Sequence, residues 1–256
     1  MPSMTLRLSK EYQKKVAVIS HERSGTHFLM NTLALNFNYI TNPWWNLDFE
    51  QGLNFHAPQS LLDYFKQVHN KPVLNVLKSH HPVEFFVDIM DYLRDQFILF
   101  YIYRDPRDTM LSNWKLISYY HTQKWDEGPK SDSVGEFLRA EPRGAMLRYQ
   151  KRQEKTVLHR WQHHVEGWLD YSEDNGDGFI MTLRYEDLNL DFNNTVKKIG
   201  AFLGRPVIMP RRPGRRDNVI KPGKGKVHAY REAFSPADNE FVLNTVGEAM
   251  KRFGYR

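Results

Sequence analysis

Four short apolar runs divide the chain, and each predicts a buried β-strand. They lie at residues 16–19, 73–77, 97–103 and 179–183. The runs are rich in β-branched, aromatic or other apolar residues and contain few polar positions, which is typical of strands buried on both faces. A sheet covered by other elements on both sides is therefore expected.

The segments between these runs carry apolar residues at helical spacing. Helices are predicted from Thr26 onward and at residues 83–93, 106–120, 155–171, 193–203 and 236–253, with one more short helix inside 128–144. Strands that alternate with helices predict an α/β protein with a central parallel sheet flanked by helices. There is no internal repeat and no clear linker, so residues 1–256 are expected to form a single domain.

A polar cluster stands near the end of each predicted strand. The clusters are Arg23 to Thr26, Lys78 to His81, Arg104 to Ser112, and Tyr185. Ligands of open parallel sheets bind beyond the carboxyl ends of the strands. The four clusters are therefore expected to meet at one edge of the sheet and to form one site there.

The composition removes several kinds of chemistry. The chain has no cysteine, which excludes disulfides, thiolate catalysis and cysteine-bound zinc and agrees with a reducing cytoplasm. Residues 1–15 show no apolar core of a signal peptide, and no apolar run approaches the roughly 20 residues that a membrane span needs. A cytoplasmic protein without a membrane partner is expected.

The net charge of +6 is concentrated near the C-terminus. Between Gly204 and Arg231 stand nine Lys or Arg residues and one acid, Asp217. Such a run is a solvated loop, a nucleic-acid patch, or a clamp over an anionic ligand. The last interpretation gains weight only if other parts of the chain also bind phosphate.

The loop after the first strand has the parts of a phosphate site. It contains one glycine and lacks the Walker pattern G-x-x-x-x-G-K-[ST]. Gly25 lets the backbone approach a ligand closely, the helix that begins at Thr26 offers free N–H groups, and Arg23 adds a guanidinium. The alternative is an ordinary strand–helix turn with a surface arginine.

Arg104 and Ser112 follow the third strand and suit a second phosphate. If Pro106 opens the helix, Ser112 lies about two turns in, on the side near the strand end. The alternative is that Arg104 forms an ion pair with Asp105, Asp108 or Glu186. The sequence leaves both interpretations open.

Lys78 and His80 leave the second strand as alternate residues, so their side chains point the same way in extended backbone. Histidine is the side chain best suited to take a proton near neutral pH, and a lysine can stabilise charge on a transferring group. The alternatives are that His80 caps the following helix, or that His81 has either role.

These clusters resemble the motifs of the cytosolic-type sulfotransferases that use 3′-phosphoadenosine 5′-phosphosulfate (PAPS). The family's [K/R]-S-G-T-x-[W/F] is similar to residues 23–28, and its K-[TS]-H-x-P to residues 78–82. Its Y-x-x-R-[DN]-P-[RK]-D-x-x-x-S matches residues 101–112, its W-x-x-H-V-x-x-W residues 161–168, and its Y-E-D-[LM] residues 185–188. The motifs occur in the family's order over most of the chain.

The resemblance implies a role for each candidate residue. Ser24, Gly25, Thr26 and His27 would hold the 5′-phosphosulfate, and Arg104 and Ser112 the 3′-phosphate. Phe28 would replace the usual tryptophan beside the adenine, and Tyr185 would contact the base. His80 would be the general base, while Arg23 and Lys78 would stabilise the sulfuryl group and the departing phosphate. No metal is implied.

The chain departs from the family in three places. Arg23 stands where many members have lysine, and arginine supplies the same charge. The C-terminal signature R-K-G-x-x-G-D-W-[KR] is reduced to residues 223–231, so Lys224, Gly225 and Lys226, or Lys221, are expected at the 3′-phosphate. The stretch before this signature is also shorter than in animal members.

The expected function is transfer of a sulfuryl group from PAPS to a hydroxyl or amine of a small molecule, with adenosine 3′,5′-bisphosphate (PAP) as product. A nucleoside or small-molecule kinase is the alternative, disfavoured by the missing GK[ST] and by the lack of a clear Mg²⁺-binding aspartate after a strand. A nucleic-acid binder is disfavoured because the basic run at 204–231 overlaps the segment that covers the donor in the family that the chain resembles. The sequence indicates no oligomeric state.

The acceptor pocket would draw on aromatic residues that core packing explains equally well: Trp44, Trp45, Phe55, His56, Phe85, Phe86, Tyr119 and Tyr120.

Overall fold

The computed structural model describes residues 14–175, 178–214 and 225–255. At its centre lies a five-stranded parallel sheet in the order β2-β3-β1-β4-β5. The strands are β1 (Lys15–Ile19), β2 (Ile40–Asn46), β3 (Asn75–Ser79), β4 (Phe97–Tyr103) and β5 (Ile180–Arg184). The α/β fold with a parallel sheet is confirmed.

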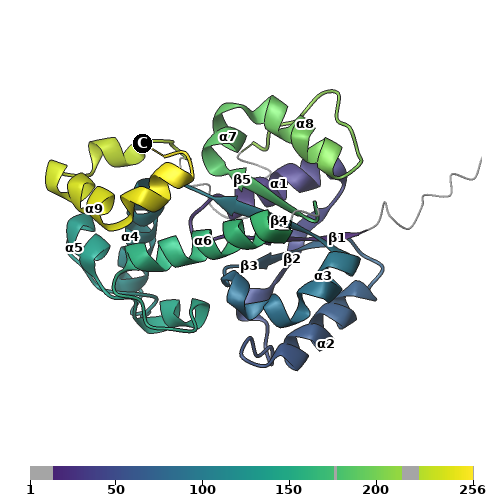
Figure 1. Ribbon diagram of the computed structural model, residues 1–256, viewed down its shortest axis with the longest axis horizontal. Coiled ribbons are helices and arrows are strands. Elements are labelled where there is room, and N and C mark those ends of the chain that lie inside the picture. Colours follow the sequence, from purple (N-terminus) through teal and green to yellow (C-terminus); the bar gives the residue numbers. More distant parts are fainter. Residues whose placement is uncertain (1–13, 176–177, 215–224, 256) are drawn as a thin grey trace, which may run out of the picture.

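Helices cover both faces of the sheet (Figure 1). On one face lie α1 (Thr26–Phe37), α7 (Tyr185–Leu190) and α8 (Phe192–Phe202), which share an apolar cluster with Val16, Val18 and Phe100. On the other face lie α2 (Pro58–His69), α3 (Met90–Gln96) and α6 (Val157–Asn175). Burial from both sides explains why the strand sequences are almost continuously apolar.

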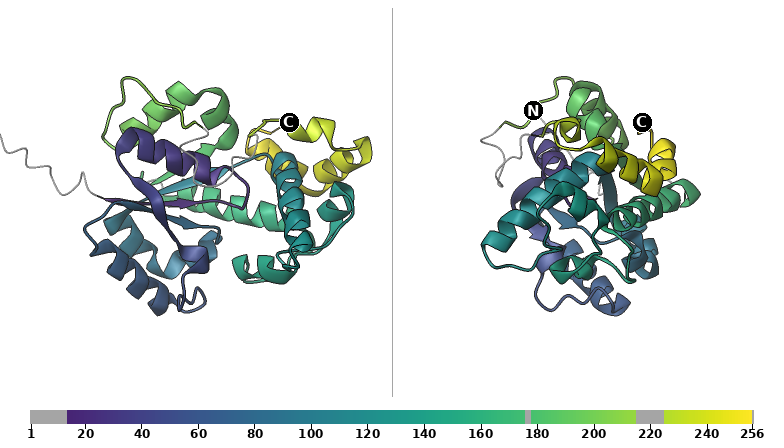
Figure 2. Two further views of the ribbon diagram at one scale, coloured as in Figure 1. Left: turned by 180° about the vertical axis from the view of Figure 1, so that it is seen from behind. Right: turned by 90° about the vertical axis from the view of Figure 1, so that its left-hand side faces the viewer.

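A third group of helices stands beyond the carboxyl ends of the strands, at the left of Figure 1 and the right of the first view in Figure 2. It consists of α4 (Pro106–Thr122), α5 (Val134–Arg139) and α9 (Pro236–Arg252). Asp105 caps α4 by accepting from the Arg107 N–H, with Pro106 in the first turn as expected. These helices form a wall beside the strand ends.

The sequence-based elements need several corrections. The strand expected at 73–77 lies two residues later, so Lys78 and Ser79 are the last residues of β3 and not part of a loop. Residues 83–93 do not form one helix but two 3₁₀ turns, Val83–Phe85 and Val87–Ile89, followed by α3. The aromatic contacts of Phe85 and Phe86 in the core override the helical pattern there.

The third correction is an additional strand. β2 is an edge strand with Pro43 and several exposed positions, so it lacks the apolar run by which the other strands are recognised. Its last residue, Asn46, pairs with Lys78 of β3. Two more helices, α2 and α7, were also not expected.

In the described ranges, no helix combines the length and apolar character needed to cross a membrane.

Candidate active site

The loop between β1 and α1 has the backbone of an anion site. Gly25 is the N-cap of α1 and has a φ of 98°, a left-handed value that favours glycine. The first N–H groups of a helix have no partner inside the helix and point out of its N-terminus. The hydroxyl of Ser24 is fully buried and has no hydrogen-bond partner among the described residues.

Thr26 and His27 follow in the first turn of α1. The Thr26 hydroxyl lies 2.6 Å from the Ser20 hydroxyl and ties the helix start to the end of β1. His27 packs edge-on against Trp44, with 5.2 Å between the ring centroids. Burial and the charges of Lys78 and Arg23 lower the pKa of His27 to about 4, so its imidazole is neutral at pH 7.

Arg104 lies at the end of β4 and faces the same loop. Its guanidinium donates to the Lys226 carbonyl at 2.9 Å and to the Arg23 carbonyl at 3.4 Å. It also pairs with Asp108 at 3.3 Å, one of the ion pairs that the sequence left open. Its Nε is buried with no partner in the described part of the chain.

Ser112 contacts Arg23 and not Arg104. The Arg23 Nε donates to the Ser112 hydroxyl at 3.0 Å. Arg23, Arg104 and Ser112 are nevertheless close together, because Arg104 binds the Arg23 carbonyl. The cluster carries two guanidinium groups, and burial followed by the charge of Arg104 lowers the pKa of Arg23.

Tyr185 and Phe28 border an aromatic area next to Gly25. Their ring centroids are 6.2 Å apart, and the Arg104 guanidinium lies over the Tyr185 ring at 4.5 Å. The Tyr185 hydroxyl donates to the Gly225 carbonyl at 2.8 Å. The backbone of residues 225–226 therefore reaches both Tyr185 and Arg104.

The basic segment is only partly described. Lys221 and Lys224 lie outside the described residues. Lys226 pairs with Glu232 through its ammonium, while its carbonyl accepts from Arg104. Asp108 holds the following residues by accepting from the backbone N–H of His228 at 2.8 Å and of Tyr230 at 3.0 Å.

Lys78 lies next to the last residue of β3, and His80 is the first residue after the strand. The Nδ1 of His80 lies 2.8 Å from the Ser20 carbonyl, so this nitrogen carries the proton. Nε2 then holds the lone pair, and no described residue bonds to it. Burial and the charge of Lys78 lower the pKa of His80 to about 3, which keeps the imidazole neutral.

His81 is held in packing contacts. Its ring stacks on Phe55 with centroids 3.4 Å apart, and its Nδ1 lies 3.0 Å from the Ser79 hydroxyl. Its pKa is also lowered, first by burial. Of the two neighbouring histidines, His80 is the one that contacts the loop after β1.

Helix α6 fixes the backbone around both clusters. The indole of Trp161 donates to the Arg104 carbonyl, and that of Trp168 to the His81 carbonyl, each at 3.2 Å. His164 Nε2 lies 3.1 Å from the His80 carbonyl. These three side chains come from the motif at 161–168, so this motif positions the polar clusters of two strands.

Several residues of this region were not among the predicted site residues. Asp48 binds Lys78, and Glu22 binds Arg160 at 2.7 Å beside the loop after β1. Asn189 donates to the Gly225 carbonyl, and the Arg212 guanidinium lies 5.1 Å from the Phe28 ring centroid. For Asn189 and Arg212, their nearness to predicted motifs in the chain was the only available signal.

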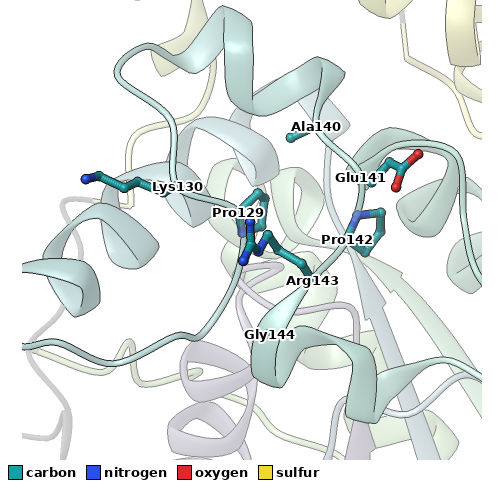
Figure 3. A pocket seen from close by; sticks show the side chains of 7 residues that line it. All are labelled: Pro129, Lys130, Ala140, Glu141, Pro142, Arg143 and Gly144. Atoms are coloured by element: carbon teal, nitrogen blue, oxygen red, sulfur yellow. The ribbon is translucent and has the colours of Figure 1, made fainter.

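A separate cavity of about 510 Å³ lies between residues 129–130 and 140–144 (Figure 3). Its charged side chains are Lys130, Glu141 and Arg143. None of the predicted site residues lines it. The candidate site is therefore the polar region at the strand ends and not this cavity.

The family follows from a match that covers most of the chain. The profile of the sulfotransferase domain family matches residues 13–222, which include the loop after β1, the end of β3, the start of α4 and Tyr185. The chain belongs to this family. The resemblance drawn from the motifs is confirmed.

Among its relatives is mouse sulfotransferase 2B1, 23% identical over 198 residues that cover 75% of this chain and 50% of that protein. Rabbit amine sulfotransferase is 24% identical over 193 residues, 73% of this chain and 55% of that protein. The chain thus spans only about half the length of these curated relatives.

The fold is shared with solved sulfotransferase structures. Mouse sulfotransferase SULT7A1, solved with PAP, superposes with a TM-score of 0.63 at 17% identity, over 94% of this chain and 85% of that one. The shared fold therefore covers nearly all of this chain.

Proposed function

We propose that this chain is an enzyme that transfers a sulfuryl group from PAPS to a hydroxyl or amine of a small-molecule acceptor. The observation that carries the proposal is the meeting of two groups. The first group is a loop with the free N–H groups of a helix N-terminus and a Ser24 hydroxyl that has no partner among the described residues. The second is His80, whose Nδ1 donates to the Ser20 carbonyl beside this loop and whose Nε2 holds a lone pair. PAPS supplies an activated sulfuryl group on a phosphate that is a good leaving group.

The described residues fit this donor. The Ser24 hydroxyl and the Arg104 Nε are buried polar groups without partners among the described residues, and both suit phosphate or sulfate oxygens. Gly25 leaves room for the backbone to approach, and the N–H groups of Thr26 and His27 favour an anion. Arg104 with Ser112 would hold the 3′-phosphate, with Gly225, Lys226 and Lys224 as further candidates, and Phe28 with Tyr185 the base.

His80 is the proposed general base. Its neutral imidazole accepts the acceptor's proton at Nε2, while Nδ1 stays bonded to the Ser20 carbonyl. In the free protein the pKa of His80 is lowered to about 3, first by burial. A bound anionic donor raises this pKa, because negative charge favours the imidazolium. The base therefore strengthens when the donor is in place.

Arg23 and Lys78 are proposed to offset negative charge. As the acceptor oxygen or nitrogen bonds to sulfur, the bond from sulfur to the phosphate oxygen breaks, and charge grows on that oxygen. A guanidinium and an ammonium fixed nearby stabilise such charge without moving. The chemistry therefore depends on positioning and electrostatics, and it needs no metal.

The acceptor is proposed to be a small molecule with an alcohol, phenol or amine. One relative is named for amine sulfation, which is one of these classes. Of the aromatic candidates, Phe55, Phe85 and Phe86 are buried in the core, whereas Tyr119 is 57% exposed. As part of the same proposal, we expect the protein to work in the cytoplasm without a nucleic-acid partner, in agreement with a chain that has no cysteine.

Calorimetric titration without metal tests the donor site. PAP, 5′-AMP and ATP are compared on the wild type, on Arg104→Ala and on Arg252→Ala, a control that removes an exposed arginine from α9. We expect micromolar or tighter binding of PAP alone, lost in Arg104→Ala and kept in the control. No preference for the 3′-phosphate would contradict the proposal, and Mg²⁺-dependent ATP turnover would favour the kinase alternative.

Release of PAP from PAPS with a panel of alcohols, phenols and amines then tests the transfer. Turnover with at least one acceptor is expected. Binding of generic DNA or RNA that weakens steeply with salt would instead favour a nucleic-acid binder.

A further inference from the structure

Asp48 contacts the Lys78 side chain near the end of β3 and the backbone of His80, the first residue after the strand. It sits in a 3₁₀ turn, Leu47–Phe49, immediately after edge strand β2. Because Asn46 of β2 pairs with Lys78 of β3, the turn that follows β2 lies beside the residues that follow Lys78. The parallel register of the two strands thus brings Asp48 to the end of β3.

The carboxylate of Asp48 contacts all four residues from Lys78 to His81, at the end of β3 and just after it. It accepts from the Lys78 ammonium at 2.5 Å and from the His80 backbone N–H at 2.8 Å. The Ser79 hydroxyl donates to it at 3.3 Å, and the His81 Nδ1 lies 3.4 Å away. Four successive residues are therefore held by one side chain.

Because these contacts are buried, the side chains that make them have little freedom to move. The Asp48 side chain has an exposed fraction of 0% and that of Lys78 only 7%. Burial alone would raise the pKa of Asp48, but the charge of Lys78 and the neighbouring histidines hold it well below its usual range. The carboxylate is therefore a fixed negative charge opposite a fixed positive one.

The ion pair with Asp48 leaves hydrogen-bond donors of the Lys78 ammonium available. An ammonium has three N–H donors, and within the described residues only one of them is taken, by Asp48. The two others remain for oxygens of a bound anion. Asp48 also fixes the backbone of His80, while the ring of His80 is held by the Ser20 carbonyl.

We propose that Asp48 is a positioning residue for sulfuryl transfer, which fixes the Lys78 ammonium and the His80 backbone in the orientation that the reaction needs. The inference rests on the proposed function, because it assumes that Lys78 and His80 act on the transferring group. A carboxylate that only balances buried charge would support folding but would not set the turnover number.

A double-mutant cycle of Asp48→Asn and Lys78→Met tests this role. We expect each single variant to lower kcat by about 10- to 100-fold. PAP affinity should fall by less than kcat, since the two variants leave the proposed contact of Arg104 with the 3′-phosphate untouched. Because Asp48 acts in part through Lys78, the double variant should lose less than the product of the two single losses.

Asp238→Asn is the matched control. Asp238 belongs to the capping box of α9 and pairs with Arg139, so its loss lowers stability without touching β3. The control should lower the melting temperature and keep kcat. If Asp48→Asn does not fold, Asp48→Glu replaces it in the cycle, because the longer side chain keeps the charge but displaces the carboxylate.

Several outcomes would overturn the role of Asp48. Wild-type kcat in the variant that folds is one, and a double variant whose loss equals the product of the single losses is another. The kcat measurements use the acceptor that turns over fastest in the panel of alcohols, phenols and amines. If none turns over, the ratio of PAPS to PAP affinity is measured in the same four proteins, with the same pattern expected. A wild type that binds neither nucleotide would instead refute the proposed function.

Discussion

The Tyr185 ring packs so closely against Gly25 that a β-carbon on residue 25 would overlap it. Gly25 also has a φ of 98°, which side chains rarely adopt. The loop after β1 and the start of α7 are thus fitted to each other at a single glycine. Both the backbone and the contact require glycine there.

Gly25→Ala is expected to damage stability and donor binding together. The left-handed backbone costs about 1–2 kcal/mol with alanine, and the overlap with Tyr185 adds about 1–3 kcal/mol. Displacement of the loop should weaken PAP binding by at least about 10-fold. Urea unfolding and calorimetry measure the two effects.

Gly52→Ala is the matched control for this change. Gly52 also has a positive φ of 79°, but nothing lies within 4 Å of an added β-carbon. It should show the backbone cost alone, with PAP affinity unchanged. Equal losses of stability in the two variants would contradict the role of the Tyr185 contact.

Asp108→Asn is expected to loosen residues 228–230 and to weaken the donor site. The carboxylate accepts from two backbone N–H groups and pairs with Arg104. An amide places its own N–H₂ where only acceptors fit, at a cost of about 2–4 kcal/mol in the free energy of unfolding. PAP affinity should fall in calorimetry, because Arg104 loses its partner.

Asp91→Asn serves as the control for this variant. Its side chain is 99% exposed, so the change should shift the unfolding free energy by less than about 0.5 kcal/mol. Wild-type stability in Asp108→Asn would show that these hydrogen bonds do not hold residues 228–230.

His80→Ala is expected to lower kcat by about 10²–10⁴-fold, because it removes the proposed base. PAP affinity should change little, since the imidazole contacts Ser20 and is not one of the groups proposed to bind the 3′-phosphate. His81→Gln is the comparison, because His81 is held by stacking on Phe55. Turnover near wild type in His80→Ala, with a large loss in His81→Gln, would move the role of base to His81.

The sequence indicates candidate site residues where the signal is local. Gly25, His80 and Arg104 stand beside apolar strands, and a parallel sheet brings strand ends together whatever the details of packing. Pro106 as the first helical residue placed Ser112 two turns into α4, whereas the motif at 161–168 was recognised only through the family resemblance.

Asp48 shows where such reasoning stops. It follows an edge strand that contains Pro43 and lacks an apolar run, so neither the strand nor its register with β3 could be read. The partner of Lys78 depends on that register. The ion pair of Arg104 with Asp108 and the contact of Ser112 with Arg23 are likewise decided by side-chain geometry that residue spacing does not contain.

Buried neutral histidines should make the protein sensitive to acid. Burial is the largest cause of a lowered pKa for His21, to about 4, and for His80, to about 3. The pKa of His164 is also well below its usual value, and its ring lies between the Tyr101 hydroxyl and the His80 carbonyl. Below about pH 6.5 the unfolded chain therefore binds protons that the folded chain does not.

The sign follows from this difference in bound protons. These histidines contribute their full stability above about pH 6.5 and lose it as the pH falls toward 4. Each one adds a slope of up to about 1.4 kcal/mol per pH unit to the free energy of unfolding. His164→Gln should reduce this slope between pH 6 and 4.5, even though it lowers stability at pH 7.5. Urea unfolding at several pH values measures it, with the exposed His69→Gln as control, and an unchanged slope in His164→Gln would contradict a neutral His164 in the folded protein.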